Sequence, residues 1–139
     1  MRKKIFAIII FIALLNNLAF SAASDSSLID LVKSQKNKLK VPCSMLPEII
    51  ERSVSNTNNK MSQKRNSDIS YEWSVSRTSS EDAVLLSFVV VTHVSFDTVT
   101  MSYSWEPRFA WVVDSKQNKV VPANYLTRSW METGRLQKP

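Results

Sequence analysis

The chain has 139 residues, with 18 lysines and arginines against 12 aspartates and glutamates, which gives a net charge of +6. Three of the basic residues, Arg2, Lys3 and Lys4, lie at the amino terminus, and the other 15 exceed the 12 acidic residues by only 3. That small excess does not support nucleic-acid binding. The chain has one glycine, Gly134, which excludes a Gly-rich phosphate-binding loop.

Residues 1–23 have the pattern of a secretory signal peptide. The three basic residues precede an apolar run from Ile5 to Leu15, and small side chains follow where signal peptidase requires them. We expect cleavage after Ala23, and a cut after Ser21 is the close alternative. Residues 24–139 then form a single exported domain, because roughly 116 residues support one core and not two.

An uncleaved membrane anchor is the other interpretation of this segment. Ile5 to Ala23 comprises 19 residues, and a spanning helix needs about 20 apolar ones. Asn16 and Asn17 argue against the anchor, because unsatisfied amides are costly inside a bilayer. In both cases the positive flank stays inside, so we expect a periplasmic or secreted protein with no transmembrane segment after cleavage.

Two helices are predicted at the start of the exported domain. Apolar residues recur at helical spacing over residues 27–38, beginning with a possible capping box at Ser27. Pro42 prevents this helix from continuing. A second, shorter helix is predicted over residues 44–55, with Ser44 as its cap.

The single cysteine, Cys43, lies in a mostly apolar segment between these helices. One cysteine cannot form an internal disulfide. Its surroundings predict a buried thiol, and pairing with another chain is the alternative.

A polar tract over residues 56–67 predicts a loop. Residues 24–66 as a whole contain eight basic and four acidic residues. This excess predicts a weak attraction to anionic headgroups or to an acidic partner. A solvated charged surface is the alternative and is favoured.

Strands follow the loop, because the hydrophobic period changes to two. The second strand is apolar at both parities, which predicts a central position with both faces covered. A closing helix is predicted over residues 124–133 and ends at Gly134. The predicted strands cover residues 69–76, 83–96, 98–105, 108–113 and 120–121.

This order predicts an α+β fold with two N-terminal helices, a four- to five-stranded antiparallel sheet and a short C-terminal helix. The order is broadly similar to that of cystatin-like and NTF2-like curved sheets. The similarity concerns architecture alone and implies no function.

The tryptophans are the first candidate binding residues. Trp73, Trp105 and Trp111 fall on the apolar faces of separate strands, where they form either the core or an aromatic platform for a sugar or peptide. The core is the favoured interpretation, since large aromatics dominate core energetics. Trp130, near Arg128, is predicted to lie at a surface.

His93 is the only histidine and the one ready proton shuttle near neutral pH. A structural histidine at the end of a strand is the favoured interpretation, because no nucleophile motif accompanies it. One histidine and one cysteine do not make the usual metal ligand sets. We therefore expect no metal and no cofactor.

The leading hypothesis is an exported, non-catalytic binding or assembly module of the cell envelope, with another envelope protein as its partner. It rests on the missing catalytic motif and on a sheet edge suited to a partner. One alternative is a small secreted hydrolase or effector that uses His93 with a nearby carboxylate. The other is an enzyme inhibitor or immunity-like protein that acts through the loop over residues 56–67.

Overall fold

The computed structural model describes residues 23–60 and 64–137. The predicted signal peptide lies outside the described residues, apart from Ala23. Among the described helices, none has the length and apolar character needed to span a bilayer.

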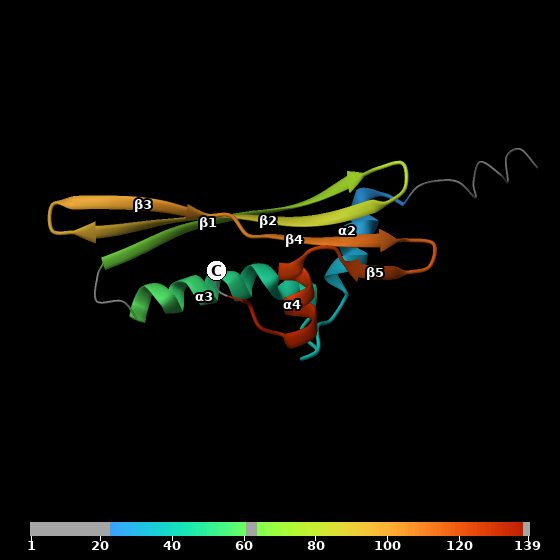
Figure 1. Cartoon of the computed structure of the whole chain (residues 1–139), viewed down its shortest axis with the longest axis horizontal. Coiled ribbons are helices and arrows are strands. Elements are labelled where there is room, and N and C mark those ends of the chain that lie inside the picture. The colour runs from blue at the N-terminus through green and yellow to red at the C-terminus, as the bar shows by residue number, and fades with distance from the viewer. Residues whose placement is uncertain (1–22, 61–63, 138–139) are drawn as a thin grey trace, which may run out of the picture.

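The fold is α+β, as the sequence predicts, with the helices on one face of a single five-stranded sheet (Figure 1). A 3₁₀ turn, η1, covers Cys43–Met45. The helices are α2 (Asp25–Lys33), α3 (Leu46–Lys60) and α4 (Tyr125–Thr133). The strands are β1 (Lys64–Arg77), β2 (Asp82–Phe96), β3 (Val99–Trp105), β4 (Arg108–Asp114) and β5 (Lys119–Pro122).

The sheet is antiparallel, with β2 at its centre. β1 pairs with the whole of β2 on one side. On the other side β3 pairs with the second half of β2 and β4 with the first half, and β5 borders β4. The pairs Val90–Trp105 and Ser87–Arg108 share one register, so Pro107 interrupts the strand without inserting a bulge.

The core lies between the sheet and the helices. Its centre is the fully buried pair Phe109 and Trp111 of β4, whose rings stack with centroids 6.2 Å apart. Burial of such large aromatic side chains is the main stabilising contribution to a core of this size. Leu28 and Val32 of α2 and Trp130 of α4 complete the cluster from the helix side.

The first helix is shorter than predicted and starts earlier. Ser24, not Ser27, is its N-cap, and the Ser24 hydroxyl accepts a hydrogen bond from the Ser27 N–H. The helix ends at Lys33. The following residues form a loop because the Asn37 side chain accepts hydrogen bonds from the N–H groups of Leu39 and Val41, satisfying backbone groups outside a helix.

The second helix is longer than predicted, and the loop predicted over residues 56–67 is wrong for most of its length. α3 continues to Lys60, and β1 begins at Lys64. The polar residues stay ordered because they bond across the core side: Asn58 donates to the Ser67 hydroxyl, which in turn lies 2.8 Å from the Thr92 hydroxyl. The cap predicted at Ser44 is also wrong, since Ser44 lies within η1.

The prediction that both faces of the central strand are covered is half wrong. The even-numbered residues of β2 from Val84 to Val94 are buried beneath the helices. The odd-numbered ones lie on the opposite face, which no described element covers, and Val89 is 42% exposed. We call this the open face of the sheet.

Two predictions at the ends of the core are confirmed. Cys43 is fully buried, with its Sγ 3.8 Å from Sδ of Met131. The last helix is capped by Asn124 and ends at Gly134, which adopts a left-handed conformation with φ of 71°. Glycine adopts this conformation without the steric cost that a Cβ imposes.

Candidate functional site

His93 lies between a hydroxyl and a carboxylate on the open face. Its Nδ1 is 2.6 Å from the Ser102 hydroxyl on β3, and its Nε2 is 3.4 Å from a carboxylate oxygen of Asp68 on β1. His93 and Ser102 are direct cross-strand partners, while Asp68 is two positions along β1 from the residue opposite His93. Three neighbouring strands thus place one group each in a line.

This line has the composition of a nucleophile, a base and an orienting acid. For that role Nδ1 accepts the Ser102 proton, while Nε2 carries a hydrogen directed at Asp68. The side chains of His93 and Asp68 are 38% and 77% exposed, so water reaches both. A site of this kind lacks the low dielectric that strengthens charge stabilisation in most hydrolases.

The backbone of β3 is open on its outer side. The Phe88 N–H donates to the Pro107 carbonyl, which marks that pair as hydrogen-bonded. Because such pairs alternate along an antiparallel ladder, Thr100, Ser102 and Ser104 direct their N–H and C=O groups away from β2. No described residue bonds with these backbone groups. We call them the open edge.

A stripe of exposed apolar side chains borders the open edge on the helix side of the sheet. It consists of Phe96, Val99, Met101 and Tyr103, which are 41%, 57%, 60% and 50% exposed. The stripe stays exposed because α3 packs against β1, on the far side of β2 (Figure 1). We call it the β3 stripe.

The outer edge of the sheet is closed farther along, where β4 takes the place of β3 beside β2. The Ala110 N–H donates to the Thr127 hydroxyl at 2.8 Å, and the Ala110 carbonyl accepts from the Ala123 N–H at 2.8 Å. Asn124 donates its side-chain amide to the Arg108 carbonyl. The outward groups of β4 are therefore satisfied by the end of the chain, unlike those of β3.

The aromatic platform, which was the alternative to a core for Trp73, Trp105 and Trp111, does not form as a unit. Trp111 is fully buried, and Trp73 stacks on it at a centroid distance of 5.9 Å. Nζ of Lys33 lies 5.4 Å from the centroid of the Trp73 ring, and this cation–π contact holds α2 against β1. Trp105 is partly buried at the end of β3, beside the β3 stripe. The favoured interpretation as core residues is confirmed for Trp111.

The surface position predicted for Trp130 is wrong. Its side chain is only 1% exposed, because α4 turns this residue toward the core. Arg128 is exposed on the opposite side of the helix. The two residues therefore do not form one binding surface.

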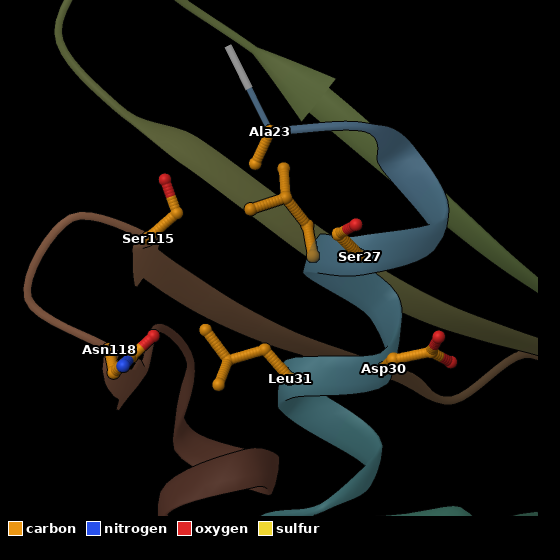
Figure 2. A pocket seen from close by; sticks show the side chains of 7 residues that line it. Ala23, Ser27, Asp30, Leu31, Ser115 and Asn118 are labelled. Carbon is orange, nitrogen blue, oxygen red and sulfur yellow. The ribbon is translucent and has the colours of Figure 1, made fainter. Parts of the chain in front are cut away.

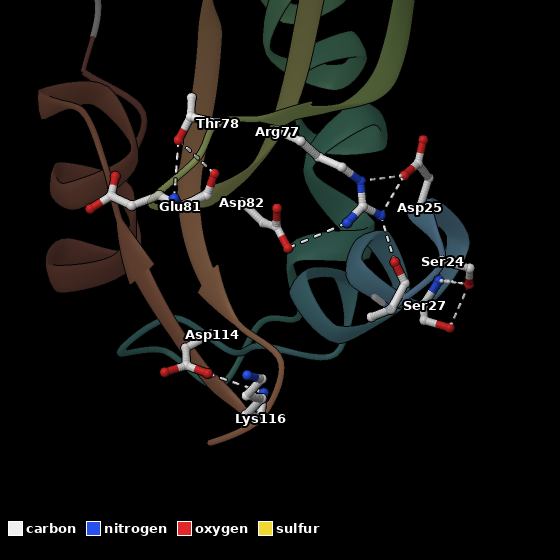
Figure 3. A network of polar contacts seen from close by, with 10 residues as sticks. Ser24, Asp25, Ser27, Arg77, Thr78, Glu81, Asp82, Asp114 and Lys116 are labelled. Atoms are coloured by element: carbon white, nitrogen blue, oxygen red, sulfur yellow. Dashed lines mark hydrogen bonds and ion pairs between the residues drawn. The ribbon is translucent and has the colours of Figure 1, made fainter. Parts of the chain in front are cut away.

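A polar network fixes the start of the domain at the other end of the sheet (Figure 3). Arg77, at the end of β1, donates to the Asp25 carboxylate at 2.7 Å and to the Ala23 carbonyl at 2.5 Å. A third contact joins Arg77 to Asp82 at 3.4 Å. One guanidinium thus ties α2 to the β1–β2 hairpin.

A hollow lies beside this network, between α2 and the turn that joins β4 to β5 (Figure 2). Ala23 and Leu31 line it from the helix side, and Ser115 and Asn118 line it from the turn. Asp30 is the only charged side chain in its lining. The lining offers no pair of groups for acid–base chemistry.

Burial raises the pKa of the Cys43 thiol to about 12. The thiol is therefore protonated and unreactive in the folded protein at neutral pH. Among residues 23–60 and 64–137, no three histidine, cysteine, aspartate or glutamate residues are placed to hold a metal ion.

Sequence reasoning named His93 but missed its partners Asp68 and Ser102, as well as the open edge. The tight turn between the strands at residues 83–96 and 98–105 was the available signal, since a short hairpin fixes which residues face each other. No protein family model matches the chain, and neither a curated protein nor a solved structure resembles it significantly. The similarity to cystatin-like and NTF2-like sheets therefore remains a prediction.

Proposed function

We propose that the protein is an exported, non-catalytic binding or assembly module of the cell envelope, and that its open edge binds an extended segment of a partner protein. One observation carries this proposal: the outward backbone groups of Thr100, Ser102 and Ser104 have no partner among residues 23–60 and 64–137, and they lie beside an exposed apolar stripe. A partner strand satisfies such groups by main-chain hydrogen bonds, and its side chains contact the stripe.

The composition of the two sheet edges supports this choice of surface. Proteins protect exposed edges with charged side chains, prolines or bulges. β3 has none of these between Val99 and Trp105, whereas β1, at the other edge, is rich in charge. The charged residues of β1 are Lys64, Arg65, Asp68, Glu72 and Arg77.

The export part of the proposal rests on the amino-terminal sequence. The basic start, the apolar run and the small residues before Ser24 match a secretory leader. Fractionation of producing cells, with mass determination of the recovered protein, tests this part. We expect a processed chain outside the cytoplasm, and an unprocessed chain dissolved in the cytosol would contradict it.

Site-specific photo-crosslinking in intact cells tests the binding surface. A photoreactive residue at Thr100 is expected to give a discrete crosslinked product, because that position faces the occupant of the edge. The same residue at Ser70, an exposed position of β1, is the matched control and is expected to give none. Equal products at both positions, or none at either, would contradict the proposal.

The line Asp68–His93–Ser102 favours a second candidate function, a small secreted hydrolase. In that role His93 takes the Ser102 proton as the hydroxyl attacks an acyl carbon, and Asp68 stabilises the charged imidazole. His93 then gives the proton to the leaving group as its bond to the acyl carbon breaks, and water releases the acyl group from Ser102 in the reverse manner. A fluorophosphonate probe, which labels activated serines, tests this function. Labelling that is lost in Ser102→Ala and His93→Ala but kept in Ser104→Ala would support a hydrolase, and no labelling of the wild type would exclude this mechanism.

The inhibitor hypothesis has lost the feature that motivated it. Residues 56–60 belong to α3 and residues 64–67 to β1, so the proposed inhibitory loop reduces to positions 61–63, which lie outside the described residues. The weak attraction to anionic surfaces remains a prediction, and three of the eight basic residues behind it, Lys36, Lys38 and Lys40, lie exposed in the loop after α2.

A further inference from the structure

We infer that the open edge is occupied by β3 of a second copy of this chain, paired antiparallel to form a continuous sheet across a symmetric dimer. This inference rests on the proposed function, since it names the occupant of the same surface. Four features of the edge lead to it: its backbone, its side chains, its lack of charge and the free space beside it.

The backbone groups of the edge are self-complementary. Antiparallel pairing with Ser102 opposite Ser102 of the second copy places Thr100 opposite Ser104 of that copy. All three outward residues then lie at hydrogen-bonded positions in both copies. This register is the one that overlaps the whole of Val99–Trp105 with itself.

The side chains also match in that register. On the helix side, Val99 lies opposite Trp105 of the second copy, and Met101 lies opposite Tyr103 of the second copy. Directly opposed aromatic and aliphatic side chains are the favourable cross-strand pairs. On the open face only serine and threonine hydroxyls meet. No apolar side chain is placed opposite a charged one.

Charge limits the pairing to this segment. The seven residues of β3 carry no charge, so two copies meet without repulsion along the overlap. Asp97 and Glu106 lie just beyond its ends, and in this register they fall opposite Pro107 and Thr98 of the second copy. The uncharged overlap therefore ends at a charged residue on each side, and Pro107 has no N–H with which to extend the ladder.

Space for the second strand exists because α3 packs against β1 and not beneath β3 (Figure 1). The twofold axis of an antiparallel strand pair runs perpendicular to the sheet, so the helices of both copies lie on the same side. Each copy uses its one uncharged edge in this contact. The assembly is therefore closed at two copies and does not grow into a filament.

Two double variants that differ only in the residue at position 104 test the inference. In Thr100→Lys/Ser104→Lys, the lysine at position 100 of each copy lies opposite the lysine at position 104 of the other, so the dimer contains two like-charged pairs. In Thr100→Lys/Ser104→Glu, the lysine of each copy lies opposite the glutamate of the other, so the dimer contains two opposite-charge pairs. Within one chain the two changed residues are four positions apart and are not direct neighbours. Sedimentation velocity of the protein recovered from producing cells, over a range of micromolar concentrations, measures the dimer.

We expect a wild-type dimer, a dissociation constant raised on the order of tenfold or more in the Lys/Lys variant, and near-wild-type dimerisation in the Lys/Glu variant. A wild type that stays monomeric, or two variants that weaken the dimer equally, would overturn the inference. The photo-crosslink at Thr100 separates the two failures. If it joins a different protein, binding at the edge stands and the second copy does not, whereas no crosslink contradicts both.

Discussion

β3 and β4 follow each other along the same side of β2 in one register, but their outward backbone groups have opposite environments. We call the β3 part of this edge the open half and the β4 part the closed half. Along β4, the outward groups of Arg108 and Ala110 are bonded by Ala123, Asn124 and Thr127, and the side chains beneath are buried. Along β3 the equivalent groups have no partner in the described part of the chain. The difference shows that the carboxy-terminal segment closes the sheet only up to Pro107, which leaves β3 paired with β2 on one side and, among the described residues, with no neighbour on its outer side.

The largest expected contrast between the halves concerns their aromatic side chains. Trp111→Ala removes a fully buried ring and is expected to lower the free energy of unfolding by about 3–5 kcal/mol. Tyr103→Ala, on the open half, is expected to cost the monomer less than about 1 kcal/mol, because the side chain is half exposed and the one hydrogen bond it accepts, from Arg65, is exposed as well. Urea unfolding of both variants measures the contrast. Similar costs would show that the β3 stripe is buried in solution.

Hydroxyl removal gives a second, smaller contrast. Thr127→Val changes a fully buried side chain and leaves the partly buried Ala110 N–H without its acceptor, and the expected loss is about 1–3 kcal/mol. Thr127→Ser keeps the hydroxyl and is the control for the bond. Thr100→Val on the open half removes a hydroxyl that faces solvent and should leave the unfolding free energy nearly unchanged. A Thr127→Val variant as stable as the wild type would mean that water replaces this contact.

The sequence was sufficient for the parts of the fold that alternate clearly. Period-two segments such as Val99–Trp105 and the closing helix ending at Gly134 are observed within one or two residues of their predicted limits. These patterns are local, because a strand or a capped helix is encoded by its own residues. The α+β class followed from their order.

Other parts depended on contacts between distant residues. The end of α3 is polar, and its order comes from Asn58 bonding to Ser67 on β1, which no local pattern indicates. Trp130 was misplaced because the face of α4 that meets the core depends on how β5 returns the chain. Likewise, the exposure of β3 depends on where α3 lies, so its apolar stripe and the core strands look alike in the sequence.

Cys43 gives a pH-dependent test of the closed half, because its thiol contacts Met131 of α4, the helix that packs against β4. Its pKa is raised by burial from 9.0 to about 12, so unfolding above pH 9 releases a proton that the folded protein retains. The stability due to the neutral thiol is therefore fully present below about pH 9 and declines as the pH rises toward 12. Native protein at pH 8 should react with iodoacetamide far more slowly than urea-unfolded protein. Equal alkylation rates would contradict the burial of this thiol.

The smallest expected effect concerns the residues around the predicted cleavage site, which also belong to the closed half. Arg77 donates to the carbonyl of Ala23, and cleavage after Ala23 would remove that carbonyl and place a charged amino group at the N-cap of α2. Positive charge at a helix N-terminus is unfavourable, so a chain that begins at Ala22 should melt at a higher temperature than one that begins at Ser24. Arg77→Gln should reduce this difference, because it removes the donor from both forms. If the two forms melt alike with Arg77 intact, the contact with the Ala23 carbonyl contributes nothing, and the network at this end rests on Asp25 and Asp82.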